Sequence, residues 1–155
     1  MTKIIGLISD THGLIRPEAL SALSGSDIII HAGDVGRPDI LGHLMAIATV
    51  FAVRGNVDNG AWAVPLPQSE TVNFGGHGLH VLHILADLAI DPKAAGLSAV
   101  ICGHTHTPLI EDKDGVLYIN PGSAGPRRFR LPVTVGQIRV EDGKLKPEII
   151  ELKVS

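Results

Sequence analysis

Cysteine, aromatic residues and long apolar runs are all scarce in this sequence. Its 155 residues include one cysteine, Cys102, which excludes an internal disulfide and fits a reducing compartment. Aromatic residues make up 3% of the chain and the net charge is -3, with no basic stripe, so we do not expect nucleic acid as a simple binding partner. No apolar run approaches the roughly 20 residues of a membrane helix, and the N-terminus lacks a signal-peptide pattern. We therefore expect a cytoplasmic protein without a membrane partner.

Histidine, in contrast, is abundant. The chain holds eight histidines beside one tryptophan, one tyrosine and three phenylalanines. Imidazole is the commonest metal ligand among the side chains, so this ratio is a first indication of a metal site. The length and the 45% hydrophobic content predict a packed core, and we expect a single domain over residues 1–155.

Apolar runs alternate with helix signals in the first half of the chain. Short runs rich in β-branched residues predict strands over 3–10, 26–34 and 48–56. Segments 16–25 and 37–47 each begin with a proline near the first helical turn and predict helices. This β-α-β-α-β order predicts a largely parallel sheet, and ligands of such sheets gather at the carboxyl ends of the strands.

The second half of the chain is richer in strand and turn signals. Prolines and a glycine predict a loop over 57–69, and we expect a short helix over 91–99. Turns at Asp114-Gly115 and Asp142-Gly143 favour an antiparallel, β-rich half. Its strand segments are expected at 70–76, 79–85, 100–106, 108–120 and 134–152.

Polar residues of metal-ligand type follow five of these apolar runs. The endings read "SDTHG" (9–13), "AGDVG" (32–36), "RGNVD" (54–58), "VLH" (81–83) and "CGHTH" (102–106). Each short motif alone is compatible with a helix cap or a turn, but five of them in order favour one shared site. Carboxylates combined with imidazoles suit first-row divalent metals better than Mg²⁺ or Ca²⁺.

Spacing within these endings predicts how the ligands converge. Two residues that lie two positions apart project to the same side of an extended segment, so Asp10 with His12 and His104 with His106 can each face one small volume. Glycines precede Asp34, Asn56 and His104, where a tight turn would bring the backbone close to an ion.

The ordered motifs D-x-H, G-D, G-N, a single His and G-H-x-H resemble those of the calcineurin-like metallophosphoesterases, from Ile4 to about Arg128. The stretch "YINPGSAGPRR" (118–128) further resembles the small prokaryotic phosphodiesterase branch. The resemblance implies an α/β fold, a four-layer α-β-β-α sandwich of two mixed β-sheets. It also implies hydrolysis of small phosphate esters with two divalent metal ions, Mn²⁺ first, with Fe²⁺, Co²⁺, Ni²⁺ or Zn²⁺ as alternatives.

The resemblance assigns a role to each candidate ligand. Asp10, His12 and His106 would bind one metal, and Asp34 would bridge both. The ligands of the second metal would be Asn56, His83 and His104. Asn56 and His83 would also complete the polar wall of the site, and both count with Asp34 as candidate catalytic residues.

Two positions depart from the family pattern. Many members carry a histidine after G-N that helps the leaving group, whereas this chain has Val57, so Asp58 is the nearest replacement candidate. The single family histidine is commonly followed by glycine, whereas His83 precedes Ile84. His80 and His77 are nearby rivals, but the end of the strand favours His83.

The remaining histidines have simpler interpretations. We expect His77, in a glycine turn, to be solvated, and His31 and His43 to be hydrogen-bonded or exposed without a functional role. Arg54, Arg127 or Arg128 could reach a substrate phosphate, and Trp62 could line a pocket or a subunit contact.

Other functions share the same motifs. A phosphomonoesterase or nucleotide pyrophosphohydrolase would use the same metal pair, and the retromer subunit of this fold acts mainly as a scaffold. All seven candidate ligand positions hold Asp, Asn or His, which favours catalysis. A homodimer or higher homo-oligomer is the base-rate expectation.

Overall fold

The apolar runs of the first half form the centre of a mixed β-sheet. The structure is a computed structural model that describes residues 2–154. Strands β1 (Lys3–Ile8), β2 (Ile28–His31) and β3 (Thr49–Ala52) are parallel. Strand β9 (Thr134–Glu141) pairs antiparallel with β1, and β10 (Lys144–Glu151) pairs with β9, which gives the order β10-β9-β1-β2-β3.

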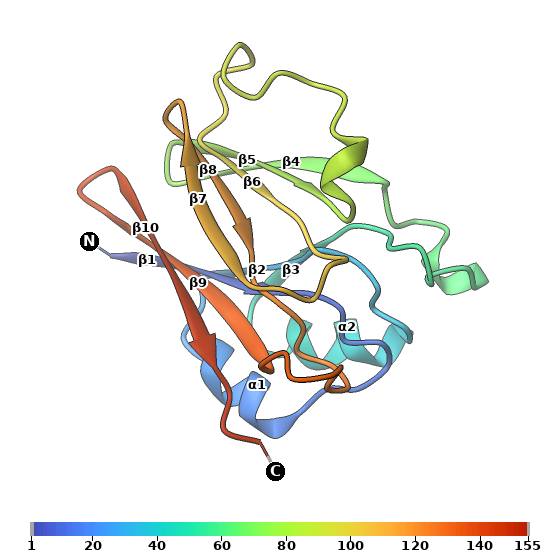
Figure 1. Ribbon diagram of the computed structural model, residues 1–155. Coiled ribbons are helices and arrows are strands. Elements are labelled where there is room, and N and C mark those ends of the chain that lie inside the picture. Colours follow the sequence, from blue (N-terminus) through green and yellow to red (C-terminus); the bar gives the residue numbers. More distant parts are fainter. Residues whose placement is uncertain (1, 155) are drawn as a thin grey trace.

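Two helices cover the outer face of this first sheet (Figure 1). Helices α1 (Pro17–Leu23) and α2 (Pro38–Met45) both have a proline in the first turn, as the sequence predicts. The buried side chains of Leu23 and Leu44 pack in one cluster with Ile29 of β2. These helices therefore fix the strands whose ends carry the polar motifs.

The second sheet is also mixed, with strand order β4-β5-β6-β8-β7. Its centre consists of the parallel strands β5 (His77–Leu82), β6 (Ala99–Ile101) and β8 (Val116–Asn120). Strands β4 (Ser69–Phe74) and β7 (Leu109–Lys113) lie antiparallel at the two edges. The prediction of an antiparallel second half is wrong at the centre, where residues 83–98 cross over and make β6 parallel to β5.

The main core lies between the two sheets. Isoleucine, leucine and valine side chains from both inner faces form one buried cluster, and they include Ile5, Leu7 and Ile30 from the first sheet and Leu79, Val81, Ile101 and Ile119 from the second. At about 25 cal/mol per Å² of buried apolar surface, this layer is the main force that holds the sheets together. The predicted sandwich of two mixed sheets is confirmed.

The outer face of the second sheet carries little helix. The helix predicted over 91–99 is wrong: this segment forms turns, and Gly96 has a left-handed φ of 72°. So short a helix is costly to nucleate, and a glycine weakens it further. Instead, a 3-10 turn, η2 (Leu85–Asp87), places Leu85 near Leu82 and Val100.

The predicted loop over 57–69 contains one 3-10 turn, η1 (Ala61–Ala63). Trp62 of this turn packs partly buried against the helix-side cluster, so it supports the fold rather than standing free at the surface. Within residues 2–154, no helix is both long enough and apolar enough to span a membrane.

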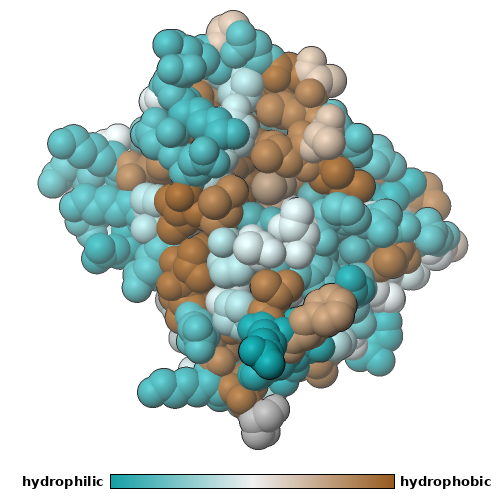
Figure 2. All heavy atoms as spheres, viewed as in Figure 1, coloured by the Kyte–Doolittle hydropathy of each residue, from teal (hydrophilic) through white to brown (hydrophobic). Residues whose placement is uncertain are grey.

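The surface in the view of Figure 2 is mixed, with several apolar areas among hydrophilic ones. Exposed apolar side chains include Leu109 and Ile110 of the edge strand β7 and Phe129, which is 95% exposed.

Candidate metal centre

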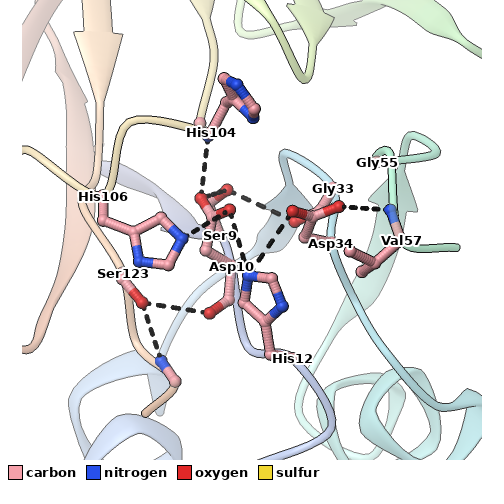
Figure 3. Close-up of polar contacts among 12 residues, drawn as sticks. Ser9, Asp10, His12, Gly33, Asp34, Gly55, Val57, His104, His106 and Ser123 are labelled. Carbon is pink, nitrogen blue, oxygen red and sulfur yellow. Dashed lines mark hydrogen bonds and ion pairs between the residues drawn. The ribbon is translucent and has the colours of Figure 1, made fainter. Parts of the chain in front are cut away.

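The polar strand endings of both sheets meet at one place (Figure 3). Two groups of side chains there have ligand atoms that all lie within 4.8 Å of one another inside each group. The first group contains Asp10, His12 and His106, and the second contains Asp34, His83 and His104. Six of the seven ligands predicted from the sequence are therefore brought together.

Asp34 lies between the two groups. Its Oδ2 atom is 3.1 Å from His83 Nε2 in its own group and 3.5 Å from His12 Nε2 in the other. Asp10 Oδ1 lies 3.3 Å from His106 Nε2, and 3.7 Å from the Nε2 atoms of both His12 and His83. The carboxylates of Asp10 and Asp34 thus each contact imidazoles from both ligand groups.

The remaining carboxylate oxygens and the second ring nitrogen of His83 are held by hydrogen bonds to neighbouring groups. Asp10 Oδ2 accepts hydrogen bonds from Ser9 Oγ at 2.7 Å and from the His104 amide at 3.0 Å. Asp34 Oδ1 accepts the Val57 amide at 3.0 Å. His83 Nδ1 donates to the Ala32 carbonyl at 2.7 Å, so Nε2 is the ring nitrogen that faces the carboxylates and is left to ligate a metal, which is the usual arrangement of a metal-ligating histidine.

The atoms that face inward lack hydrogen-bond partners. Asp10 Oδ1, His12 Nε2 and His83 Nε2 are buried and unpaired, and both ring nitrogens lie 3.7 Å from Asp10 Oδ1. An unsatisfied buried polar atom costs about 1–3 kcal/mol, so three of them close together favour a bound ligand that compensates them. Lone pairs on carboxylates and imidazoles accept a divalent cation, and the residues present fit one.

Electrostatics in the cluster agree with this fit. Burial raises the pKa of Asp34, but the His83 ring, 3.1 Å from Asp34 Oδ2, and the hydrogen bond from the Val57 amide outweigh it and lower the pKa to about 2. Burial lowers the pKa of His83, but the Asp34 and Ala32 bonds outweigh it and raise the pKa. The cluster therefore attracts positive charge, which a metal cation supplies better than a proton.

The backbone at these residues is unusual. Among residues 2–154, eight non-glycine residues have a positive φ, and five of them are candidate ligands: Asp10 (55°), His12 (48°), Asp34 (56°), His104 (74°) and His106 (63°). Each such conformation is strained and persists only when its surroundings impose it. The prediction that these ligands project from extended segments is wrong, because each strand ends before the ligand and the turn aims the side chain.

Two glycines allow close approach at the cluster. A Cβ atom on Gly33, whose φ is 102°, would lie 2.7 Å from His83 Nδ1. A Cβ atom on Gly103 would lie 2.7 Å from Asp10 Oδ2. Side chains at either position would displace a candidate ligand.

Asn56, the seventh predicted ligand, is exposed and lies beside His83 on the wall of a cavity of about 410 Å³. Other polar side chains on this wall are Arg54, Asn59, Gln68, Ser69 and Asp87. The cavity therefore opens from the His83 side of the cluster.

Asp58 has a role other than the predicted replacement for the family histidine. Its side chain is 1% exposed and accepts three backbone amides: Val35 at 3.1 Å, Gly36 at 2.9 Å and Gly55 at 2.9 Å. Both carboxylate oxygens are occupied by backbone amides and the side chain does not line the cavity, so Asp58 is not placed to reach a leaving group. Asp58 ties the turn after β2 to the turn after β3.

The rival histidines lie outside the cluster. His80 shares a 3.0 Å hydrogen bond with Thr71 Oγ1. His77, predicted to be solvated, is partly buried: its Nε2 donates to the Gly143 carbonyl at 2.8 Å, and its Nδ1 lies 2.7 Å from Ser98 Oγ. His43 is exposed, as expected.

Several residues that shape the cluster were missed from the sequence. Asn120 Nδ2 donates to the Gly103 carbonyl and to Thr105 Oγ1, both at 3.0 Å, and Ser123 Oγ donates to the Asp10 carbonyl at 3.1 Å. Asn120 and Ser123 belong to the "NPGS" stretch, which stands out in the sequence, but the sequence does not show that their side chains contact the turns of the cluster. Ser9, next to Asp10, gave no signal at all.

The three candidate arginines differ in position. Arg54 lines the cavity while its Nη2 donates to the Val64 carbonyl at 2.9 Å. The positive charge of Arg128 contributes to lowering the pKa of His106, after the larger effect of burial, so it lies within electrostatic reach of the cluster. Arg127 donates to the Val154 carbonyl at 3.5 Å.

The fold and this cluster together define an α/β sandwich protein with a candidate cation-binding centre at its strand ends. Residues 4–143 match the family model of the calcineurin-like phosphoesterase superfamily domain. The chain belongs to that superfamily.

Relatives cover nearly the whole chain. A probable metallophosphoesterase of Methanocaldococcus jannaschii is 36% identical over 98% of this chain and 83% of its own length. A protein named as a phosphodiesterase from the same organism is 26% identical, over 95% of this chain and 99% of its own length. In structure, vacuolar protein sorting 29 of Cryptosporidium parvum has the same fold, with a TM-score of 0.77 and 18% identity over 97% of this chain and 98% of its own.

Proposed function

We propose that the protein is a cytoplasmic phosphodiesterase that hydrolyses small phosphate esters with two divalent cations, Mn²⁺ first. The observation that carries the proposal is the position of Asp34, whose Oδ2 atom lies within 3.5 Å of histidines from both ligand groups. A carboxylate so placed is suited to bridge two cations. The phosphodiesterase name of one relative supports the choice of reaction.

In this proposal one cation is held by Asp10, His12 and His106, and the other by Asn56, His83 and His104, with Asp34 shared. Two cations, when bound, would supply an activated water and neutralise the charge of the phosphate oxygens. No serine, cysteine or other protein nucleophile is then required.

The protein's own contribution is to hold these groups charged and correctly aimed. The low pKa of Asp34 keeps it ionised, and the Ala32 carbonyl fixes the proton of His83 on Nδ1. The 410 Å³ cavity beside His83 and Asn56 provides room for an ester substituent. Arg54 on its wall and Arg128 near His106 are the candidate contacts for phosphate oxygens.

The leaving group receives little help from the chain. Val57 stands where many family members have a histidine, and Asp58 is committed to backbone amides. We therefore propose that esters with acidic leaving groups, such as aryl phosphodiesters, are the fastest substrates, because such groups depart without protonation.

The test combines metal analysis with an assay on the full chain. We expect about two metal ions per chain after loading with Mn²⁺, and Mn²⁺-dependent hydrolysis of bis(4-nitrophenyl) phosphate that exceeds hydrolysis of the corresponding monoester. Faster cleavage of the monoester would favour a phosphomonoesterase, and preferred cleavage of a nucleoside diphosphate linkage would favour a pyrophosphohydrolase. Metal binding without turnover of any ester would favour a scaffold and refute the enzyme proposal.

A further inference from the structure

His31, the last residue of β2, is fully buried and belongs to neither ligand group. Its ring nevertheless contacts the two turns that carry three of the candidate ligands, Asp10, His12 and Asp34. The Gly33 amide donates to His31 Nδ1 at 3.1 Å, and His31 Nε2 lies 3.0 Å from Thr11 Oγ1. The Thr11 hydroxyl in turn donates to the Val35 carbonyl at 2.8 Å.

These contacts allow only one arrangement of protons. His31 Nδ1 accepts the Gly33 amide, so it carries no proton. The Val35 carbonyl can only accept, so the single hydroxyl proton of Thr11 points to it. His31 Nε2 must therefore donate to Thr11 Oγ1, and the chain of bonds runs in one direction through a neutral ring.

The groups joined in this way flank the ligands. Thr11 lies between Asp10 and His12, and Gly33 and Val35 lie on either side of Asp34. The same turns are joined by backbone bonds from the His12 amide to the Asp34 carbonyl at 2.9 Å and from the Asp10 amide to the Gly33 carbonyl at 3.0 Å.

Backbone bonds alone do not explain why these turns keep their shape. Asp10, His12 and Asp34 all have left-handed φ angles, which non-glycine residues adopt only when the surroundings hold them. The side-chain bonds of His31 and Thr11 add that constraint from fully buried positions that do not line the cavity.

We infer that His31 and Thr11 are a positioning pair that sets the separation of the Asp10 and Asp34 carboxylates for a pair of divalent cations. Neither residue touches the cations or the substrate. The inference rests on the proposed metal-dependent function and deepens it by naming the residues that hold its ligands in place.

The test measures Mn²⁺ affinity by isothermal titration calorimetry on the purified full chain. Thr11→Val keeps the shape of the side chain and removes the hydroxyl, Thr11→Ser keeps the hydroxyl, and His31→Leu removes both bonds of the ring. The chain offers a matched control in Thr71 and His80, a second bonded threonine–histidine pair that lies across β4 and β5, outside the cluster. Thr71→Val and His80→Leu are made in parallel.

We expect Thr11→Val and His31→Leu to weaken Mn²⁺ binding by about tenfold or more, the usual effect of losing a group that supports metal ligands. Thr11→Ser should restore most of the affinity, and the control variants should bind as the parent does. The electron paramagnetic resonance spectrum of the bound Mn²⁺ pair should change in Thr11→Val, because the spacing of the ions changes. Far-UV circular dichroism establishes that each variant is folded, and the Thr11 variants decide the matter if His31→Leu is not.

Two results would overturn the inference and leave the proposed function intact. One is a parent that binds two Mn²⁺ ions while Thr11→Val binds them equally well with the same spectrum. The other is an equal loss of affinity in Thr11→Val and Thr71→Val, which would indicate general destabilisation. A folded parent protein that binds no Mn²⁺ would overturn the inference and the proposed function together.

Discussion

His83 Nδ1 donates a hydrogen bond to the Ala32 carbonyl oxygen over 2.7 Å, and this bond joins the two sheets at the candidate metal centre. His83 follows β5 of the second sheet, and Ala32 follows β2 of the first. The bond leaves the other ring nitrogen of His83 facing Asp10 and Asp34. Packing between the sheets and the geometry of the centre therefore depend on each other.

The position of His83 between Asp34 and the Ala32 carbonyl predicts how the stabilisation of the folded protein by Mn²⁺ depends on pH. In the metal-free protein the pKa of His83 is raised above its usual 6.5, although burial alone would lower it. A raised pKa in the folded state stabilises the protein below the usual value, and this contribution is lost as the pH rises through the raised pKa. Mn²⁺ replaces that proton, so the increase in Tm on adding Mn²⁺ should be larger at about pH 8 than at about pH 6, by several degrees. Equal increases at both pH values would contradict the account.

Replacing Asp34 by Asn should abolish the pair of cations. The change removes the negative charge that both ligand groups share, so we expect Mn²⁺ content to fall from about two to one or none per chain and turnover to fall to background. Asp39→Asn is the matched control, because Asp39 is exposed and pairs with Arg37 on the surface. Metal content is measured by elemental analysis after gel filtration. Retained turnover in Asp34→Asn would refute the bridging role.

The Asp58→Asn variant tests whether Asp58 has a structural role or acts as the catalytic acid. An amide can accept fewer of the three backbone N–H groups that Asp58 now binds, so we expect a loss of about 1–3 kcal/mol in the free energy of unfolding. Urea denaturation of the metal-free protein measures this loss. The dependence of kcat on the pKa of the leaving group should stay unchanged in the variant. A steeper dependence would return Asp58 to the role of acid.

The leaving-group dependence of the parent enzyme is itself a test. Without a proton donor at Val57, kcat/KM for a series of aryl and alkyl methyl phosphodiesters should fall steeply as the pKa of the leaving alcohol rises. Val57→His restores the side chain found in many family members and should flatten that slope. A rate indifferent to leaving-group pKa in the parent would show that another group supplies the proton.

Much of this architecture could be predicted from local sequence patterns. Proline at the starts of α1 and α2 and the β-branched runs of β1 and β2 report directly on backbone preference. The turns 91–97 could not be predicted in the same way, because a weak helical pattern decides little without tertiary contacts.

The sequence likewise predicts some features of the candidate site and not others. Ligand types and their order were readable, because Asp, Asn and His are written in the sequence at the strand ends. The left-handed backbone at Asp10 or His104 was not, since the surrounding loops impose it against the residue's own preference. The role of Asp58 was misread for a related reason: a carboxylate beside a site looks the same in sequence whether it faces the cavity or the backbone.

The most direct measurement of the central claim is a crystal structure of the protein grown with Mn²⁺, with data collected at the manganese absorption edge. We expect two anomalous peaks, one bounded by Asp10, His12 and His106 and the other by Asn56, His83 and His104, with Asp34 in contact with both. An ordered site without an anomalous peak beside Asp34 would contradict the account and leave only the fold.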